Sequence, residues 1–308
     1  MKAVRIHSFG GPEVLVYEDA PRPTMGGDEV LVRVHAASIN PVERFVRGGY
    51  LQGRVEFTLP LILGLDLSGV VEAVGPGVTG IAVGDAVYGY SNMMRQGAYA
   101  EYAAVGANEV APKPKTIDHV AASAVPLAGL TAWQALDLLG LTGGQSVLVH
   151  GAGGGVGTFA VQFAVQRGVR VLATAAAHNG DLLRALGVDQ VIDYTITNFE
   201  DVVDNVDGVL DLVGGDVQAR SLAVLKPGGV LVTTAGQPDA AAAEASGVRA
   251  LGMMAYADPT QLALIGGLID AGAVKPVVSE VFPLAEARQA HALAERGHAQ
   301  GKIVLRVV

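Results

Sequence analysis

No cysteine occurs anywhere in the 308 residues of the chain. This absence excludes a disulfide, a thiolate nucleophile and a zinc or iron–sulfur centre held by cysteine. Charged residues make up only 17% of the chain, no basic run is found, and the formal net charge is −9. A negative net charge argues against binding to nucleic acid or to an anionic membrane through a general electrostatic field.

Long apolar runs are also missing. No stretch of about 18 uncharged apolar residues occurs. The opening residues, MKAVRIHSFGG, alternate polar with apolar and lack the apolar centre of a signal peptide. We therefore expect a cytoplasmic protein. What the chain does have is a hydrophobic content of 50%, together with enough length for two domains with separate cores.

Residues 146–168 (SVLVHGAGGGVGTFAVQFAVQRG) are the most informative stretch. Residues 147–149 predict a strand buried in a parallel sheet, and a helix follows. Between them, residues 152–157 match the dinucleotide fingerprint G-x-G-x-x-G with alanine in the first position. The second glycine admits the pyrophosphate, the third allows close helix packing, and the N–H groups of the helix N-terminus bind phosphate. The predicted cofactor-binding residues here are Ala152, Gly154, Gly155, Val156 and Gly157.

The flanking regions predict two kinds of domain. Short alternating segments at residues 2–8, 29–36, 69–74 and 85–90, separated by glycine and proline turns, predict a partly closed, antiparallel, barrel-like β domain. Apolar strands then alternate with helical segments, which predicts an α/β fold with a doubly wound parallel sheet. Its strands after the glycine motif are expected at residues 170–174, 190–194, 208–213, 229–234 and 248–255.

The C-terminal region is expected to return to the β-rich domain. Residues 284–296 predict a helix and residues 301–308 a closing strand. We assign residues 1–118 and 273–308 to the β-rich domain. Residues 119–272 are assigned to the dinucleotide-binding domain.

Several ordered motifs across nearly the whole chain resemble the medium-chain dehydrogenase/reductase superfamily. Within it the chain resembles the zinc-free quinone oxidoreductase branch, also called zeta-crystallin-like. The resemblance implies a GroES-like domain beside a Rossmann domain. The motifs that carry it are the opening MKA, ASINP at 37–41, PLILGLDLSGVV at 60–71, GLTA at 129–132, the fingerprint, VIDY at 191–194 and GKIV at 301–304.

The same resemblance predicts that no metal is bound. In zinc-dependent relatives a cysteine normally stands at the position of Asn40, and residues 64–66 would be Gly-His-Glu rather than Gly-Leu-Asp. Two expected ligands are thus missing, and scattered histidines do not supply a zinc set. We expect His35 and His150 to be strand histidines with satisfied hydrogen bonds, and not metal ligands.

The choice of nicotinamide cofactor rests on the second strand of the dinucleotide fold. An NAD site would place a carboxylate at its end, but residues 172–177 contain none. His178 and Asn179 can donate to a 2′-phosphate, which favours NADPH; alternatively they only cap the following helix. The resemblance implies further cofactor contacts from Thr131, Thr174, Tyr194, Gly214 and Gly236.

The acceptor side is predicted from the resemblance alone. It places Asn40 and Thr131 near the nicotinamide, and Tyr50 and Asp66 toward the acceptor, so Asn40, Tyr50 and Asp66 are the candidate catalytic residues. Each has a structural alternative. Asn40 stands before proline and could be a turn residue, and Tyr50 could be an exposed loop aromatic. Asp66 could cap backbone amides, and Thr131 could fill a helix interior.

Together these features predict an NADPH-dependent reductase that passes hydride to a small quinone or α,β-unsaturated carbonyl without zinc. A short-chain dehydrogenase is disfavoured, because no tyrosine has a lysine four residues later. An NADPH-binding structural or sensor protein stays open, because a fold does not fix a function. We also expect a homodimer that pairs edge strands at residues 248–255, with no nucleic-acid or membrane partner.

Overall fold

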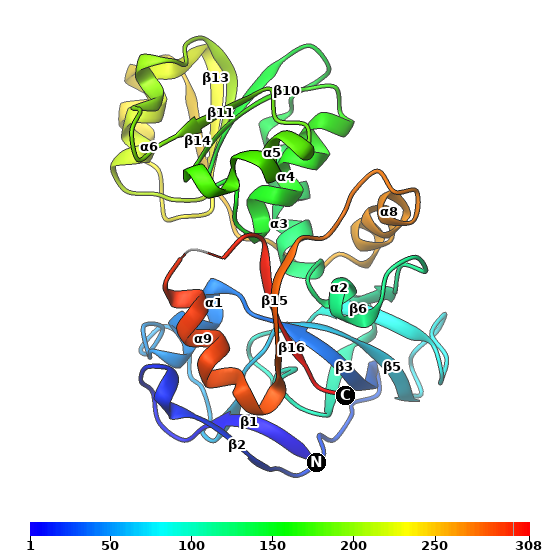
Figure 1. Ribbon diagram of the computed structural model, residues 1–308. Coiled ribbons are helices and arrows are strands. Elements are labelled where there is room, and N and C mark those ends of the chain that lie inside the picture. The colour runs from blue at the N-terminus through cyan, green and yellow to red at the C-terminus, as the bar shows by residue number, and fades with distance from the viewer. Residues whose placement is uncertain (298) are drawn as a thin grey trace. The chain divides into compact units, whose positions relative to one another are not determined.

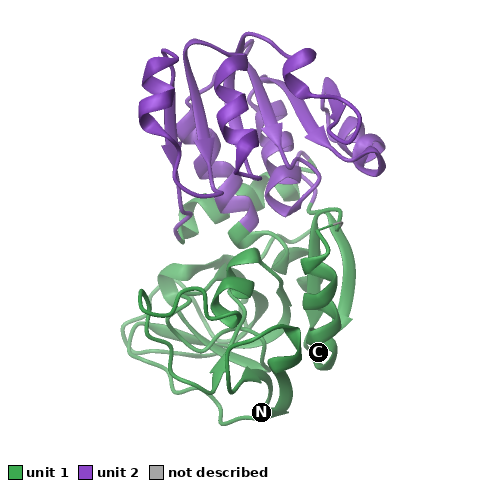
Figure 2. Ribbon diagram, turned by 90° about the vertical axis from the view of Figure 1, so that its left-hand side faces the viewer, with its two compact units in different colours: residues 1–127, 257–272, 276–308 green, residues 128–256, 273–275 purple. Residues whose placement is uncertain are grey.

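The computed structural model describes residues 1–297 and 299–308 (Figure 1). The chain divides into two compact units, drawn in separate colours in Figure 2. Unit 1 comprises residues 1–127, 257–272 and 276–308, and unit 2 comprises residues 128–256 and 273–275. Among the described residues, no helix is both long and apolar enough to cross a membrane.

Unit 1 is the predicted β-rich unit. One sheet has the order β15-β16-β3-β5-β6-β8 with β7 also paired to β3, and a smaller one has the order β2-β1-β4. The described strand pairs within residues 1–118 are antiparallel, as predicted, whereas β15, which was not predicted, pairs parallel with β16. The strands are β1 (Lys2–Ile6), β2 (Leu15–Asp19), β3 (Glu29–Ser38), β4 (Leu61–Ile62), β5 (Asp66–Val74), β6 (Ala86–Tyr90), β7 (Tyr102–Gly106), β8 (Val110–Pro112), β15 (Val278–Pro283) and β16 (Lys302–Arg306).

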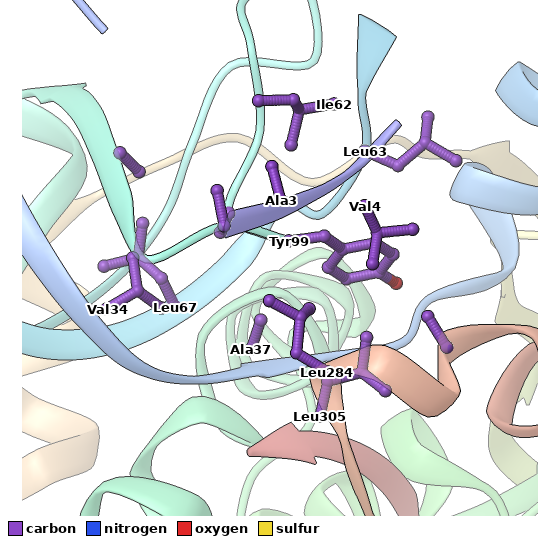
Figure 3. Packing of buried hydrophobic residues seen from close by; sticks show 14 of the residues in the cluster. Ala3, Val4, Val34, Ala37, Ile62, Leu63, Leu67, Tyr99, Leu284 and Leu305 are labelled. Carbon is purple, nitrogen blue, oxygen red and sulfur yellow. The ribbon is translucent and has the colours of Figure 1, made fainter. Parts of the chain in front are cut away.

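Apolar side chains from most of these strands form one core, in which the ring of Tyr99 lies among aliphatic residues (Figure 3). Short helices border this core. Helix α1 follows Asn40, which is its N-cap in a capping box with Glu43, and Pro41 occupies the first helical position. The helices of the unit are η1 (Pro12–Val14), α1 (Pro41–Arg47), η2 (Ala107–Glu109), α2 (His119–Ser123), α8 (Pro259–Asp270), η6 (Leu284–Glu286) and α9 (Ala287–Glu295).

Unit 2 has the predicted doubly wound fold. Its sheet has the order β11-β10-β9-β12-β13-β14 with all neighbours parallel, so the order reverses beside β9. The strands are β9 (Ser146–His150), β10 (Arg170–Ala175), β11 (Gln190–Asp193), β12 (Val206–Asp211), β13 (Leu225–Thr233) and β14 (Arg249–Gly252). The helices are α3 (Pro126–Leu139), α4 (Gly155–Gln166), η3 (Ala177–Asn179), α5 (Gly180–Ala185), η4 (Phe199–Asp201), α6 (Asp216–Ser221), η5 (Leu222–Val224) and α7 (Ala240–Ala245).

The unit boundaries differ from the predicted domain boundaries. Residues 119–127 and 257–272 belong to unit 1, because α2 packs on β3 and β5, and α8 packs on β8. Tyr88 Oη donates to the carbonyl of Leu262 in α8 at 2.5 Å. The helix-forming composition of these segments predicts that they belong to the dinucleotide-binding domain, but their contacts lie with the β-rich unit.

Candidate functional site

Unit 2 gathers most of the predicted cofactor residues at one edge of its sheet. The carboxyl ends of parallel strands share an edge, and ligands of such folds bind there beside the point where the strand order reverses. The predicted residues follow five strands of the sheet: the glycine turn follows β9, His178 and Asn179 follow β10, Tyr194 follows β11, Gly214 follows β12 and Gly236 follows β13.

The backbone explains the alanine in the fingerprint. The left-handed conformation falls one residue earlier, on Gly151 with φ +72°, so Ala152 needs no glycine. A Cβ on Gly157 would lie 2.5 Å from Ala152 Cα and from Gly151 O. The third glycine is therefore required for α4 to pack against the turn.

The start of α4 fits a pyrophosphate. Gly154 is the N-cap, and the N–H groups of residues 155–157 have no intrahelical carbonyl to bond. A Cβ on Gly154 would find its nearest neighbour, Gly151 O, at 3.5 Å, which is an ordinary contact. Small residues therefore leave the backbone open to a phosphate that the helix N-terminus attracts.

A buried hydrogen-bond acceptor lies after β10, where the ribose of a dinucleotide would bind. Asn179 is buried against Gly153, where an added Cβ would lie 2.5 Å from Asn179 Cγ. Asn179 Nδ2 bonds His178 Nε2 at 3.1 Å, but Oδ1 has no hydrogen-bond partner in the part of the chain that is described. The Asn179 side chain makes no capping bond to α5. A ribose hydroxyl would supply the missing donor, so these residues fit a dinucleotide.

Tyr194 and Thr174 differ in accessibility. Tyr194 is 60% exposed just beyond β11, where a ligand can reach it. Thr174 is buried, and its hydroxyl bonds His150 Nδ1 at 2.9 Å. The carbonyl of Thr174, not its hydroxyl, meets the glycine turn, where it accepts the N–H of Ala152 at 3.3 Å.

His150 has the satisfied hydrogen bonds that the sequence analysis expected. Its Nε2 bonds Ser221 Oγ at 3.0 Å, and its Nδ1 bonds Thr174. Burial lowers the pKa of His150 to about 4. The imidazole is therefore neutral near pH 7 and has a structural role in the sheet.

A buried carboxylate that was not among the predicted site residues holds the turn after β12. Asp211 Oδ1 accepts the N–H groups of Val213 and Gly214, each at 2.9 Å, and Oδ2 accepts Thr233 Oγ1 at 2.9 Å. Gly214 has φ +80°, a conformation that favours glycine. The available signal was an aspartate at the end of an apolar strand, directly before a glycine turn.

The two remaining cofactor candidates also lie in unit 2. Gly236, after β13, has φ +105°, and a Cβ there would meet nothing within 4 Å. Thr131 lies buried in α3. Its position is consistent with either a cofactor contact or the helix-interior alternative.

In unit 1, two of the three candidate catalytic residues are in contact. Asn40 Nδ2 donates to Asp66 Oδ2 at 3.0 Å, and both residues are buried. Ser38 Oγ donates to the same oxygen at 2.7 Å. Asp66 Oδ1 accepts the backbone N–H of Leu127 at 2.8 Å, which is the capping role considered for it.

Lys302 joins these residues and was missed as a site residue. Its ammonium donates to Asn40 Oδ1 at 2.5 Å, to Ile39 O at 2.8 Å and to Asp66 Oδ2 at 3.3 Å. It is 5% exposed, whereas lysine is rarely buried without a partner. The available signal was a lysine among the apolar residues of the predicted closing strand.

A second carboxylate extends the network. Glu43 Oε2 accepts Tyr99 Oη at 2.5 Å, and Tyr99 Oη bonds His291 Nε2 at 3.2 Å. Arg47 Nη1 donates to His291 Nδ1 at 2.9 Å. Burial raises the pKa of Glu43, and burial with the nearby Glu43 raises the pKa of Tyr99 well above its usual range. Burial lowers the pKa of His291 to about 3, so its neutral ring donates from Nε2 to Tyr99.

Tyr50 lies outside the network. It is 67% exposed in the turn after α1, and its ring meets Phe45 edge-on with centroids 6.1 Å apart. Within the described residues, no hydrogen bond joins it to Asn40 or Asp66. In this structure Tyr50 has the form of the exposed loop aromatic that was the alternative.

No group of three histidine, aspartate or glutamate side chains among the described residues could hold a metal ion. His35 stacks on His119 with centroids 4.3 Å apart. The expectation of satisfied hydrogen bonds is wrong for His35, because its buried Nε2 has no partner in the described chain.

Two family models match the chain. The model of an alcohol dehydrogenase GroES-like domain covers residues 26–115, and the model of a zinc-binding dehydrogenase covers residues 186–305.

Curated relatives match almost the whole chain. The mitochondrial NAD(P)H oxidoreductase RTN4IP1 of Mus musculus is 34% identical over 100% of this chain and 89% of its own. The chloroplastic NADPH-dependent alkenal/one oxidoreductase of Arabidopsis thaliana is 35% identical over 99% and 79%. The quinone oxidoreductase of Rattus norvegicus is 32% identical over 98% and 96%.

Solved structures agree with this fold over the full chain. The quinone oxidoreductase from Coxiella burnetii has a TM-score of 0.94 and 36% identity, covering 100% of this chain and 99% of its own. An NAD-dependent alcohol dehydrogenase has a TM-score of 0.92 and 35% identity, with both chains covered completely. The Escherichia coli quinone oxidoreductase complexed with NADPH has a TM-score of 0.90 and 27% identity, again with both chains covered completely.

Proposed function

Because this chain belongs to the quinone oxidoreductase branch of the medium-chain dehydrogenase/reductase superfamily, we propose that it reduces a quinone or an α,β-unsaturated carbonyl with NADPH and without zinc. Its relatives establish the coarser statement, an oxidoreductase with a nicotinamide cofactor. The bound nicotinamide would supply the hydride. The chain's own residues bind the cofactor, orient it and shape the acceptor side.

The observation that carries the proposal is the ammonium of Lys302 against Asn40 and Asp66. The resemblance aligns Asn40 and residues 64–66 with positions that bear zinc ligands in zinc-dependent relatives. In this chain those positions carry an amide, a leucine and an aspartate, and the aspartate is already paired with a lysine. This set supports a reaction that needs no Lewis acid from the protein.

The hydrogen bonds of Asn40 favour an acceptor that spreads its own charge. Reduction of an isolated ketone concentrates charge on one oxygen, which a metal or strong donors would have to stabilise. Both N–H groups of Asn40 point toward carboxylates, Asp66 at 3.0 Å and Glu43 at 3.4 Å, and Tyr50 is mostly exposed. A quinone or conjugated enone delocalises the charge, so it needs the least stabilisation from the protein's hydrogen-bond donors.

The preference for NADPH rests on the end of β10. No carboxylate is available there to bond the ribose 2′-hydroxyl. His178, Tyr194 and Arg184 are the groups that could meet a 2′-phosphate. Arg184 Nη1 lies 3.2 Å from the Cβ position of Gly180, so its side chain runs back toward the start of α5. It pairs with Asp181 at 2.9 Å in an exposed ion pair that is worth little.

Oxidation of NADPH, followed by its absorbance with a panel of quinones and conjugated enones, tests the proposal. We expect turnover with members of both classes and none with simple alcohols or saturated ketones. Alcohol dehydrogenase activity in metal-free protein, with no reaction toward any quinone or enone, would contradict it. NADPH binding without turnover on any acceptor would instead favour the sensor alternative.

A homodimer and a cytoplasmic location stay predictions from the sequence. The strand expected to pair between copies is β14, which lies at the end of the sheet order in unit 2 and is paired there with β13. Light scattering on the purified protein would measure the mass, and a monomer at micromolar concentration would contradict the dimer.

A further inference from the structure

We infer that Lys302 is a positioning residue that fixes the orientation of the Asn40 side-chain amide. The catalytic consequence of this inference rests on the proposed function and on the resemblance, which places Asn40 near the nicotinamide. The orientation itself follows from the hydrogen bonds of unit 1.

Lys302 has no donor left for a substrate. Its three N–H groups are used by Ile39 O, Asn40 Oδ1 and Asp66 Oδ2, and an ammonium has only three. Its side chain is also only 6% exposed. Lys302 therefore holds its neighbours in place and does not donate a proton to the substrate.

The charges around Asn40 allow one orientation of its amide. Oδ1 faces the Lys302 ammonium, while Nδ2 faces Asp66 Oδ2 at 3.0 Å and Glu43 Oε1 at 3.4 Å. The flipped amide would turn its NH₂ group toward an ammonium and its oxygen toward two carboxylates. That arrangement replaces three attractive contacts with repulsive ones at a buried site, where electrostatic interactions are strong.

Lys302 is also the cation that compensates the two buried carboxylates. Asp66 is fully buried and Glu43 is 2% exposed. The other buried cation nearby, Arg47, is engaged with His291 and Glu295. Without Lys302, Asp66 would be a buried carboxylate without a positive partner, which is strongly destabilising.

The test uses three variants. Lys302→Met removes the ammonium and keeps the aliphatic chain, but it leaves Asp66 unpaired and could unfold the protein. The double variant Asp66→Asn, Lys302→Met removes both charges, which buried pairs often tolerate. Lys113→Met is the matched control: Lys113 also lies in unit 1 and donates to carbonyl oxygens, those of Pro114 and Ile117, but does not touch Asn40.

The first measurement follows the Asn40 amide directly. The chain has six asparagines, so protein labelled with ¹⁵N-asparagine gives few side-chain NH₂ pairs, and Asn40→Ala assigns one by its loss. We expect a pair protected from exchange with water in the wild type and in Lys113→Met. In the double variant the substitution at position 66 adds one further NH₂ pair. We expect the Asn40 pair to exchange at least about tenfold faster there, because Glu43 is the one charged group left of the three that orient the amide.

The second measurement separates orientation from binding. We expect kcat to fall about 100-fold in both Lys302 variants, as misplacement of a group near the reacting atoms does. The Kd of NADPH should change less than about threefold, because unit 2 supplies the phosphate and ribose contacts. Wild-type amide protection and kcat in the double variant would overturn the inference, as would an equal loss in Lys113→Met. The amide signals require no turnover, so an inactive wild type would refute the proposed function and still leave this inference decided.

Discussion

The predicted cofactor edge of unit 2, at the carboxyl ends of its strands, and the polar network of unit 1 around Asn40, Asp66 and Lys302 differ in the groups that form them. The cofactor edge is mostly main chain, with left-handed glycines at 151, 214 and 236 and the open N-terminus of α4. The network of unit 1 is mostly side chain, and its members are far apart in sequence, with a separation of 262 positions from Asn40 to Lys302. One site depends on local backbone shape, and the other depends on the completed tertiary structure.

This difference decides how each site fails. A backbone site is damaged when a side chain is added, because the added atoms fill the space that the ligand or a neighbouring helix needs. A network of buried charged and polar groups is damaged when a side chain or a proton is changed, because its partners are left unsatisfied.

The largest expected effect is acid destabilisation through buried neutral histidines. The pKa of His291 in unit 1 is lowered to about 3 and that of His150 in unit 2 to about 4, both by burial. Each folded pKa lies below the unfolded value, so the unfolded chain binds more protons below pH 6.5. Stability is fully present above about pH 6.5 and is lost as the pH falls toward 4, by about 3 kcal/mol for each imidazole.

Urea unfolding at pH 7, 5.5 and 4 measures this loss. His291→Gln should remove its share of the pH dependence, although it also lowers stability at pH 7, because the bonds to Tyr99 and Arg47 change. A wild-type stability that stays constant from pH 7 to pH 4 would contradict the neutral, buried state of both rings.

The next effect concerns the glycine turn. Gly157→Ala would place a Cβ 2.5 Å from Ala152 Cα and from Gly151 O, so α4 must shift away from the turn. We expect a loss of about 1–3 kcal/mol in stability, as overpacking causes. The affinity for NADPH should fall about 100-fold, because the displaced N–H groups no longer meet the phosphates.

Gly143→Ala is the matched control for this change. Its Cβ would lie 3.5 Å from the nearest atom, Arg167 O, and Gly143 is not in the left-handed region. Fluorescence titration with NADPH and thermal unfolding compare the two variants. Equal affinities in both would mean that the close packing at Gly157 does not shape the phosphate site.

The third effect, on stability alone, is expected at Asp211, whose carboxylate supports the turn after β12 from within the sheet. Asp211→Asn keeps the volume but turns one acceptor into a donor, and either the N–H groups of Val213 and Gly214 or Thr233 Oγ1 loses a charged partner. Hydrogen bonds to charged groups contribute about 1.5–3 kcal/mol. We expect the free energy of unfolding, measured with urea, to fall by an amount in this range. A loss below about 0.5 kcal/mol would show that the turn is stable without the carboxylate.

Most of the fold, including the sheet edge where the predicted cofactor residues gather, could be predicted because its signals are local. Strand alternation, the fingerprint and glycine turns need only a few neighbouring residues, and they located β9, α4 and the turns after β12 and β13. The domain assignment was wrong for segments whose position depends on their tertiary contacts. Residues 257–272 have helical texture but pack on the β-rich unit.

The polar network illustrates the limit more sharply. The resemblance singled out Asn40 and Asp66, but nothing local says that Lys302, Tyr99 and His291 converge near them. Tyr50 was chosen in the same way and lies exposed. Long-range packing determines which polar residues meet, so a sequence pattern identifies the candidates and the fold selects among them.

The smallest effect tests whether side chains add anything to the backbone-built edge. His178, which follows β10, and Arg184 in α5 are the groups we expect to meet a 2′-phosphate. One charge-assisted hydrogen bond contributes about 1.5–3 kcal/mol, which is about 10- to 100-fold in affinity. NADPH should therefore bind more tightly than NADH by this factor, and His178→Ala or Arg184→Ala should each weaken NADPH and leave NADH nearly unchanged.

Arg170→Ala is the control, because Arg170 is an exposed arginine at the amino end of β10, the opposite edge of the sheet from the cofactor site. Titration of the three variants with both cofactors separates a specific phosphate contact from a general loss of positive charge. Equal weakening by all three changes would indicate only long-range attraction, which salt screens. Equal wild-type affinities for NADPH and NADH would mean that Asn179 and the α4 backbone bind the parts common to both cofactors and that no side chain reads the 2′ position.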